Sequence, residues 1–338
     1  MTPDEIRSLN EKGYYKDCPV KGELIETHIS WIILSEKYAF KIKKPVKFSF
    51  LDFSTSDQRQ FFCKREVTLN SRFSDIYLST EPIFFEDGKW VIGGRGVEPI
   101  DFTVVMRKMD EHKRMDLMMD SDKVDQVAVT ELAKNISRFH LKAERILDPF
   151  ELTKVKTIFN DILTIEELEE KGYKCGELKS AIRQAIRVSD SFLEKNQEYF
   201  QRRIEQGYKR DLHGDLHCGN VFLENPPVIF DCIEFNDEYR QIDVLYDIAF
   251  LSMDMESWGR KDLSQLLENT YKKSINVFLT PEDDKLYVYF KCLRANIRAK
   301  IYGLRLAQAS DDTAKVQFLK VFDRYFSLFK HYVDLLES

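Results

Sequence analysis

The stretch LHGDLHCGNVFL, residues 212–223, places two histidines, an aspartate and an asparagine directly before an apolar extended run. The sequence NPP breaks that run, and VIF resumes it before Asp231. This pattern predicts a β-hairpin with its turn at Asn225 and Pro226. Residues equidistant from a hairpin turn face each other, so Asn220 and Asp231 are predicted to meet at its open end.

An amide oxygen beside a carboxylate suits Mg²⁺, which combines a few hard protein oxygens with phosphate oxygens and water. We therefore predict Asn220 and Asp231 as metal ligands. Asp215 precedes Asn220 by five residues. The spacing D-x-x-x-x-N is typical of phosphoryl-transfer catalytic loops, in which the aspartate accepts the proton of a substrate hydroxyl. Asp215 is thus the predicted base.

The rest of the chain divides into two parts with different predicted secondary structure. Short strand-like runs, including SWIIL and YAFKI, precede residue 109 and surround one helix that begins near Ser54. Helical patterns dominate after residue 109, and 338 residues exceed what one core usually needs. We predict an N-terminal nucleotide-binding lobe over residues 1–108. A mostly helical lobe over residues 109–338 would carry the catalytic loop and the acceptor site.

HGDLHCGN, followed by FDCIEFND and DVLYDIAF, resembles the aminoglycoside phosphotransferase and choline kinase superfamily. THISWIIL, AFKIKKPVKFSFLDFS and LRANIRAK are similar to a bacterial branch of uncharacterised aminoglycoside-phosphotransferase-like proteins, so the likeness covers nearly the whole chain. The resemblance implies a bilobal, protein-kinase-like α+β fold, with a small antiparallel sheet and one helix in the first lobe. It also implies ATP and Mg²⁺ as cofactors.

The resemblance implies the same base and metal ligands as the loop pattern does. It gives His213 a structural role within the loop. Asp243 and Asp247 match acids at a helix start that anchor the catalytic loop by hydrogen bonds. The identity of the acceptor does not carry over, because one fold hosts many specificities.

Lys41 in YAFKIKK is the predicted phosphate-binding lysine, since the family pattern and the kinase V-A-I-K motif both place it there. Lys43 lies on the same strand face and is the alternative. The partner acid is expected on the following helix, at Glu66 in CKREVTLN.

No kinase-type G-x-G-x-x-G precedes the phosphate-binding lysine, so the segment IETHIS is expected to cover the phosphates. Its candidate donors are Thr27, His28 and Ser30. The adenine is expected against the segment after FTVVM, formed by Arg107, Lys108 and Met109.

Acidic residues just beyond the second metal ligand are candidates for the acceptor site: Glu234, Asp237 and Glu238. Three arginines lie near one face of a late predicted helix: Arg294, Arg298 and Arg305. They could grip an anionic acceptor or pair with local acids, and the sequence favours neither interpretation.

The formal charge of −6 argues against a nucleic-acid partner, which usually requires a basic surplus. No apolar run approaches the roughly 18 residues of a membrane span, and MTPDEIRSLN lacks the features of a signal peptide. The cysteines show no CxxC spacing, which is typical of reduced thiols. We therefore expect a cytoplasmic protein whose partners are a nucleotide and a hydroxyl-bearing acceptor.

The predicted function is ATP- and Mg²⁺-dependent transfer of the γ-phosphate to a hydroxyl of an unidentified, small-molecule acceptor. Two alternatives remain open. A metal-dependent hydrolase would use His213, Asp215 and His217, since imidazole nitrogens suit Zn²⁺. A pseudokinase would bind nucleotide as a scaffold without turnover.

Overall fold

The computed structural model describes residues 1–94, 96, 98–173 and 177–337. The chain forms two compact units. The first comprises residues 1–114, 220–224 and 228–240, and the second contains the remainder. Compared with the predicted lobes, the first unit continues past residue 108 and includes most of the hairpin expected in the second lobe.

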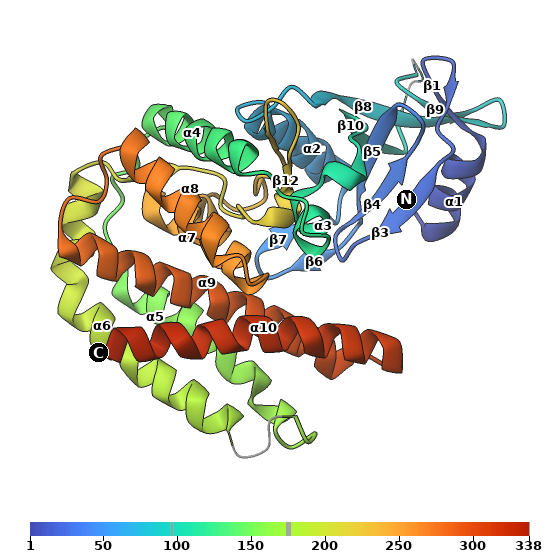
Figure 1. Ribbon diagram of the computed structural model, residues 1–338. Helices are drawn as coiled ribbons and strands as arrows, with labels where there is room; N and C mark the ends of the chain where they lie inside the picture. Colours follow the sequence, from blue (N-terminus) through green and yellow to red (C-terminus); the bar gives the residue numbers. More distant parts are fainter. Residues whose placement is uncertain (95, 97, 174–176, 338) are drawn as a thin grey trace. The chain divides into compact units, whose positions relative to one another are not determined.

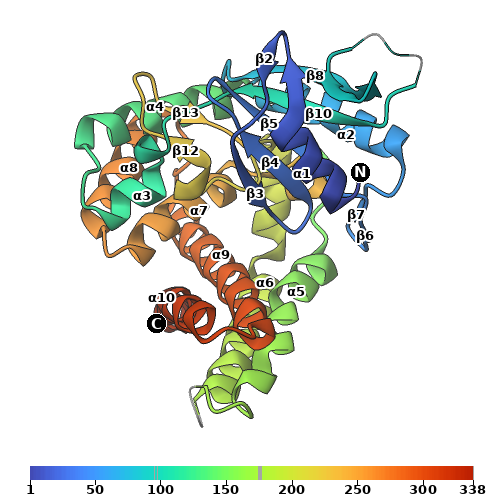
Figure 2. The same ribbon diagram turned by 90° about the vertical axis from the view of Figure 1, so that its right-hand side faces the viewer.

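The first unit is built on a sheet of strands β1 (Gly13–Tyr15), β2 (Cys18–Pro19), β3 (Glu23–Glu26), β4 (Ser30–Leu34), β5 (Tyr38–Lys43), β8 (Tyr77–Glu86), β9 (Lys89–Ile92) and β10 (Asp101–Arg107). Their order is β2-β1-β9-β8-β10-β5-β4-β3 (Figures 1 and 2). Neighbouring strands are antiparallel except β1 and β9, which run parallel. β4 and β5 are the SWIIL and YAFKI runs, joined as a hairpin as their sequences predict.

Each face of this sheet is covered by one helix. Helix α1 (Pro3–Lys12) packs Ile6 and Leu9 into a core that contains Phe40 and Ile42 of β5. Helix α2 (Ser56–Asn70) begins after the N-cap Thr55 and packs Cys63 into a cluster with Ala39, on the opposite face. Side chains alternate along a strand, so Lys41 and Lys43 share the α2 face with Ala39.

The first unit also contains the short elements β6 (Lys47–Phe48), β7 (Leu51–Asp52), η1 (Glu111–Lys113), β12 (Val221–Phe222), β13 (Val228–Ile229) and η4 (Asp237–Tyr239). The β12–β13 hairpin pairs Val221 with Ile229, and Phe230 N–H donates to the Asn220 carbonyl at 3.1 Å. The prediction that Asn220 faces Asp231 is therefore wrong by one residue. The loop is longer than a two-residue turn because Pro227, which lacks an N–H, cannot begin the ladder.

The second unit is mostly helical. Its elements are α3 (Met115–Asp120), α4 (Gln126–Lys142), α5 (Leu152–Asn160), η2 (Asp161–Leu168), α6 (Leu178–Glu205), β11 (Lys209–Asp211), β14 (Gln241–Asp243), α7 (Val244–Ser257), α8 (Lys261–Ser274), α9 (Pro281–Gln308) and α10 (Asp312–Glu337), while η3 (Cys218–Asn220) joins the two units along the chain. Helix α9 packs along α10 and also against α7, and α4 packs against α8 (Figures 1 and 2). None of the described helices is long and apolar enough to cross a membrane.

Candidate active site

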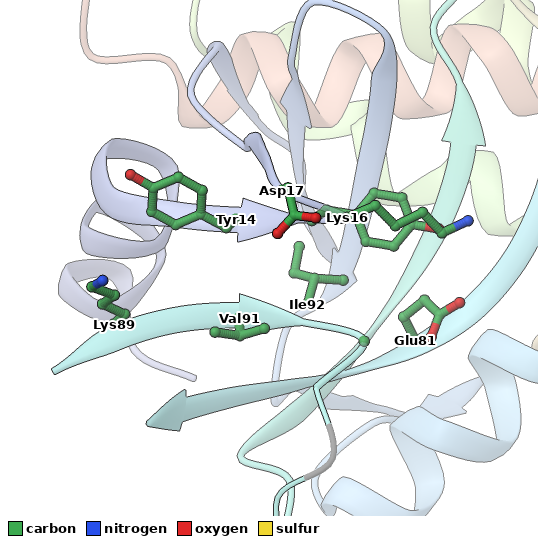
Figure 3. A pocket seen from close by; sticks show the side chains of 9 residues that line it. Tyr14, Lys16, Asp17, Glu81, Lys89, Val91 and Ile92 are labelled. Carbon is green, nitrogen blue, oxygen red and sulfur yellow. The ribbon is translucent and has the colours of Figure 1, made fainter. Parts of the chain in front are cut away.

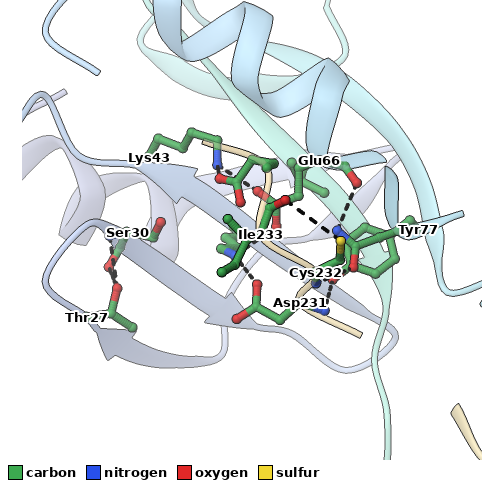
Figure 4. A network of polar contacts seen from close by, with 12 residues as sticks. Thr27, Ser30, Lys43, Glu66, Tyr77, Asp231, Cys232 and Ile233 are labelled. Atoms are coloured by element: carbon green, nitrogen blue, oxygen red, sulfur yellow. Dashed lines mark hydrogen bonds and ion pairs between the residues drawn. The ribbon is translucent and has the colours of Figure 1, made fainter. Parts of the chain in front are cut away.

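Two lysines of β5 meet one glutamate of α2 in the first unit. Lys43 Nζ donates to Glu66 Oε2 at 2.7 Å (Figure 4). Lys41 Nζ donates to the other oxygen, Glu66 Oε1, at 2.8 Å. The lysines are two residues apart, so both side chains leave the strand toward the helix. Glu66 is fully buried, and each of its carboxylate oxygens has a cationic partner. The ion pair expected between Lys41 and Glu66 is present; its role in binding phosphate stays a prediction.

Each lysine also contacts an acid from the segment that follows β13. Lys41 Nζ lies 2.6 Å from Asp231 Oδ1, and Lys43 donates to Glu234 Oε1. The two pairs differ in exposure: the side chains of Lys41 and Asp231 are 12% and 43% exposed, whereas those of Lys43 and Glu234 are 0% and 4% exposed. Lys41 and Asp231 therefore form the solvent-accessible part of the cluster.

The charges within the cluster shift the pKa values of its own residues. Burial would lower the pKa of Lys41, but Asp231 and Glu66 outweigh it and raise that pKa well above its usual value. Burial would raise the pKa of Glu66, yet Lys41 and Lys43 lower it to about 2. For Glu234, burial and the nearby Glu66 raise the pKa despite the contact with Lys43. The cluster therefore keeps both lysines charged at neutral pH.

The backbone around Asp231 is held by side chains of β8 and α2. Asp231 N–H donates to the Tyr77 hydroxyl at 2.9 Å, and Cys232 N–H donates to Asn70 Oδ1 at 2.8 Å. Asp231 has a φ of 62°, in the left-handed region that costs most residues energy. Sequence reasoning missed Tyr77 and Asn70. The buried Asn70 lies one helical turn after Glu66, which is the signal that could have indicated it.

The predicted metal ligands both lie in the first unit. Asn220 is 7% exposed and immediately precedes β12, and Asp231 follows β13 after one intervening residue. Mg²⁺ binds few protein oxygens and completes its coordination with water and phosphate oxygens. The partly exposed carboxylate of Asp231 and the amide oxygen of Asn220 are hard donors of this kind, so they fit Mg²⁺. The hairpin register makes the two residues diagonal neighbours rather than a directly facing pair.

The loop after β11 is anchored by Asp247 of α7 in the second unit. Asp247 Oδ2 accepts from His213 N–H at 3.3 Å, and Asp247 Oδ1 accepts from Gly214 N–H at 3.0 Å. His140 Nε2 lies 3.2 Å from the same Oδ2 atom. Asp247 is fully buried, and burial would raise its pKa, but the hydrogen bond and charge of His140 lower it. The anchor is therefore an anion that accepts backbone N–H groups.

Within the loop, both histidines hold backbone groups. Asp215 N–H donates to His213 Nδ1 at 3.2 Å, and Gly219 N–H donates to His217 Nδ1 at 3.0 Å. His217 Nε2 lies 3.5 Å from Asp215 Oδ2. Burial would raise the pKa of Asp215, but His217 and the arginines of α9 lower it. Asp215 is thus a carboxylate at neutral pH, with a side chain that is 41% exposed.

The other predicted loop anchor, Asp243, has a different position. It accepts from Leu245 N–H at 2.8 Å as the N-cap of α7, and Arg203 Nε donates to Asp243 Oδ2 at 2.7 Å. β14 ends at Asp243, and the register pairs this residue with Lys209 of β11. Asp243 therefore fixes the strand pair from which the loop emerges. Asp254, which sequence reasoning missed, accepts from Cys218 N–H at 2.9 Å and supports the far end of the loop.

The residues predicted to cover the phosphates form the β3–β4 turn. Thr27 Oγ1 donates to the Ser30 carbonyl at 3.0 Å and accepts from Ser30 N–H at 2.9 Å, while His28 is exposed. Ser30 lies opposite Lys43 in the strand register. The Thr27 hydroxyl and the Ser30 backbone therefore hold the turn itself, and the buried Ser30 Oγ lacks a hydrogen-bond partner.

The segment predicted to meet the adenine lies at the end of β10. Arg107 pairs with Asp75 at 3.0 Å, and Lys108 N–H donates to the Lys37 carbonyl at 3.0 Å. Met109 is buried in the apolar cluster that contains Ala39. The backbone of this segment thus borders apolar side chains, which suits the face of a planar base.

The predicted acceptor residues do not act as a group. Glu234 is buried and paired with Lys43, so the acceptor role expected for it does not fit its position. Asp237 accepts from Arg65 and Arg240, which lower its pKa although burial opposes them. Glu238 alone of the three is exposed. Sequence spacing placed these acids near the predicted metal ligand but could not show which lysine and arginine side chains they contact.

A cavity of about 740 Å³ lies beside β1 and β9 of the first unit (Figure 3). Charges of both signs line it, from Lys16, Asp17, Glu81 and Lys89. Its lining shares no residue with the lysine–glutamate cluster, so the predicted site is not this cavity. Within the described part of the chain, no group of three or more histidine, cysteine, aspartate or glutamate side chains is arranged to hold a metal ion.

No family model matches the sequence. Curated relatives are uncharacterized proteins of Mycobacterium bovis and Mycobacterium tuberculosis, 32% identical over 296 residues. The alignment covers 86% of this chain and 56% of each relative, so the chain spans about half the length of the curated relatives it matches.

Solved structures match most of the chain. A choline/ethanolamine kinase family protein from Mesorhizobium loti has a TM-score of 0.53 at 13% identity, covering 99% of both chains. The GDP complex of aminoglycoside 2′-phosphotransferase-IIIa has a TM-score of 0.51 at 16% identity, covering 90% of this chain and 92% of the other. Choline kinase from Cryptosporidium parvum has a TM-score of 0.53 at 12% identity, covering 92% and 87%. The chain therefore has the α+β, kinase-like fold of the choline kinases and aminoglycoside phosphotransferases, which confirms the fold predicted from its sequence.

Proposed function

We propose that this protein is an ATP- and Mg²⁺-dependent phosphotransferase that moves the γ-phosphate of the nucleotide to a hydroxyl of a small-molecule acceptor. The observation that carries the proposal is the position of Lys41, which donates to both Glu66 and Asp231. Kinase sites require this arrangement of a phosphate-binding lysine, a helix glutamate and a metal-binding aspartate. Further support comes from solved structures of the same fold, which are named as kinases and phosphotransferases and include a GDP complex.

In this proposal Lys41 binds the α- and β-phosphates while Glu66 holds its ammonium group in place. Asp231 and Asn220 would hold Mg²⁺, which neutralises charge on the phosphate oxygens when bound. Asp231 contacts Lys41, so bound nucleotide would compete with this contact. Lys41 would then hold the phosphates, and the Asp231 carboxylate would be available to hold the metal.

Asp215 accepts the proton of the acceptor hydroxyl in the proposed reaction. The hydroxyl oxygen forms a bond to the γ-phosphorus, the bond from that phosphorus to the β-phosphate oxygen breaks, and ADP leaves. Asp215 is a carboxylate at neutral pH, so it is able to accept the proton. Asp247 accepts hydrogen bonds from the loop backbone and thereby positions Asp215.

Purified protein tests the proposal through two separate measurements. Calorimetry with Mg-ATP and Mg-GTP, with and without EDTA, measures nucleotide binding and its need for metal. Transfer of label from [γ-³²P]ATP to a set of hydroxyl compounds measures activity, with Asp215→Asn as the matched inactive control. We expect metal-dependent binding and Asp215-dependent transfer.

Other outcomes of the same experiment would point to other functions. Nucleotide binding without transfer to any acceptor would favour the pseudokinase alternative and overturn the enzymatic proposal. Stoichiometric zinc in the purified protein would favour the hydrolase. That alternative is disfavoured by the loop, in which the Nδ1 atoms of His213 and His217 already accept backbone N–H groups.

A further inference from the structure

Two arginines of α9 lie beside the catalytic loop in the second unit. Arg294 is 6% exposed, and its Nη2 donates to the Gly214 carbonyl at 2.9 Å. Its guanidinium lies over the ring of Tyr246, 3.8 Å from the centroid, and 4.6 Å from the centroid of Phe250. Arg294 therefore braces the loop next to Asp215 and stacks on aromatic rings.

Arg298 lies one helical turn later and has weaker partners. Its Nη2 lies 3.3 Å from the hydroxyl of Tyr325 and 3.5 Å from that of Tyr302. Rings of Phe250, Tyr302 and Tyr325 surround the guanidinium at 5.1–5.9 Å. Tyrosine hydroxyls and ring faces stabilise a cation only partly, because neither carries the opposite charge.

Among the described residues, the polar contacts of these two arginines are those to the Gly214 carbonyl and to tyrosine hydroxyls, and neither arginine has an ion pair with a carboxylate. The Nε atoms of both are buried and lack hydrogen-bond partners. The nearby acids are engaged elsewhere: Asp254 accepts from Cys218 N–H and from the Tyr325 hydroxyl, and Asp247 holds the loop. Neither arginine thus forms a direct ion pair with a local acid, although Asp254 and Asp215 lie near enough to Arg298 to raise its pKa against the effect of burial. Arg298 is only partly buried, and a guanidinium in this position has N–H donors that a direct anionic partner would use.

The charge of Arg298 lies close to the predicted base. His217 Nε2 is 3.5 Å from Asp215 Oδ2, and the His217 ring lies 5.3 Å from the ring of Phe250, over which Arg298 also lies. Arg298 lowers the pKa of Asp215, although burial opposes this effect. An acceptor with its hydroxyl at Asp215 would therefore place a neighbouring substituent near Arg298.

We propose that Arg298 binds an anionic group of the acceptor, a carboxylate or a phosphate, so that the acceptor is a hydroxyl compound with negative charge. This inference rests on the proposed function and specifies its substrate class. A guanidinium presents a planar fork of N–H donors that matches either anion. Arg294, which is occupied by the Gly214 carbonyl, positions the loop beside this site.

Sulfate is a probe that tests the anion site without turnover. Its affinity is measured by calorimetry at constant ionic strength in the presence of saturating Mg-ADP, so that sulfate does not report on Lys41. Arg298→Gln should weaken sulfate binding by roughly tenfold or more, the effect of losing a charge-assisted contact. Arg305→Gln, two turns further along α9, is the matched control and should leave sulfate affinity unchanged. Equal affinities of wild type and Arg298→Gln would overturn the proposal.

The tyrosine contacts of Arg298 also contribute to folding, so melting temperatures are measured for each variant. If Arg298→Gln does not fold, Arg298→Lys replaces it, because lysine keeps the charge but loses the fork. Sulfate affinity in Arg298→Lys should then fall severalfold at an unchanged melting temperature; an unchanged affinity contradicts the inference. Mg-ADP binding is recorded on the same samples, and its absence would count against the proposed function rather than against the anion site.

Matched acceptors test specificity in the transfer assay. Glycerate, glycerol 3-phosphate and glucose 6-phosphate supply anionic arms, glycerol and glucose are their neutral counterparts, and choline and kanamycin are cationic. We expect transfer to at least one anionic compound and a much lower kcat/KM for its neutral counterpart. Arg298→Gln should raise KM for the anionic acceptor more than it lowers kcat. Preferential use of a cationic acceptor would overturn the inference while leaving the phosphotransferase proposal intact.

Discussion

Lys43 Nζ lies 2.7 Å from Glu66 Oε2, whereas Lys41 donates to the other carboxylate oxygen, Glu66 Oε1. One buried glutamate therefore pairs with two lysines on the same face of β5. The lysines differ in their second partners, since Lys41 contacts the partly exposed Asp231 and Lys43 contacts the buried Glu234. This asymmetry supports our proposal that Lys41 binds the phosphates while Lys43 holds the fold, and it makes the two substitutions distinguishable.

Lys41→Met should weaken nucleotide use and leave the protein folded. The substitution removes the cation that we propose to bind phosphate, while Lys43 still pairs with Glu66. Contacts of this charged kind contribute about 1.5–3 kcal/mol, so Mg-ATP affinity should fall on the order of tenfold to a hundredfold. Calorimetric titration measures the affinity, and circular dichroism checks the fold. Unchanged affinity in a folded variant would remove Lys41 from the site.

Lys43→Met should instead destabilise the protein. Lys43 is fully buried, and its loss leaves Glu234 without its cation and Glu66 with one partner. Breaking one side of a buried ion pair costs about 3–5 kcal/mol. Urea unfolding of the variant measures this loss, with Lys44→Met, next along the chain and paired with the exposed Glu26, as the surface control. A stable Lys43→Met protein that has lost nucleotide binding would exchange the roles of the two lysines.

Asp215→Asn and Asp231→Asn should separate the base from the metal site. Asparagine at position 215 keeps the shape but cannot accept the proton, so transfer should fall by about 10²- to 10⁴-fold with Mg-ATP affinity nearly unchanged. Asparagine at position 231 loses a charged metal ligand, so binding and turnover should decline together. Nucleotide titration and turnover of both variants are the measurements. Loss of Mg-ATP binding in Asp215→Asn, with retention in Asp231→Asn, would reverse the two roles.

Stability should fall with acid as Glu66 takes up a proton. Its folded pKa of about 2 lies below that of an ordinary glutamate, so its contribution is complete above about pH 5 and is lost as the pH falls toward 2. A lowering of this size corresponds to about 3 kcal/mol. Glu234 has a raised pKa and partly offsets the loss, because its proton uptake favours the folded state.

Urea unfolding between about pH 5 and pH 2.5 checks this dependence. The wild-type free energy of unfolding should decline more steeply over this range than that of Glu66→Gln, which has no carboxylate to titrate. Parallel declines in the two proteins would show that Glu66 does not carry the effect.

The sequence by itself determined the local elements and the chemistry that they bear. Alternation in YAFKIKK placed Lys41 and Lys43 on one face, and a capping threonine with helical periodicity placed Glu66 on the next helix. These features depend on neighbours within a few residues, where backbone geometry is fixed by strand and helix periods. The compositional change after residue 109 likewise indicated the helical second unit.

Only the tertiary structure decided which charges meet. Glu234 appeared to be a free acid beyond a metal ligand, yet it is buried against Lys43, 191 residues away along the chain. Tyr77 and Asn70, which hold the backbone at Asp231 and Cys232, carry no motif at all. The hairpin register also differed by one residue, because Pro227 cannot donate to the ladder and the loop lengthens. Pairings of this kind depend on packing between distant segments, which local periodicity does not encode.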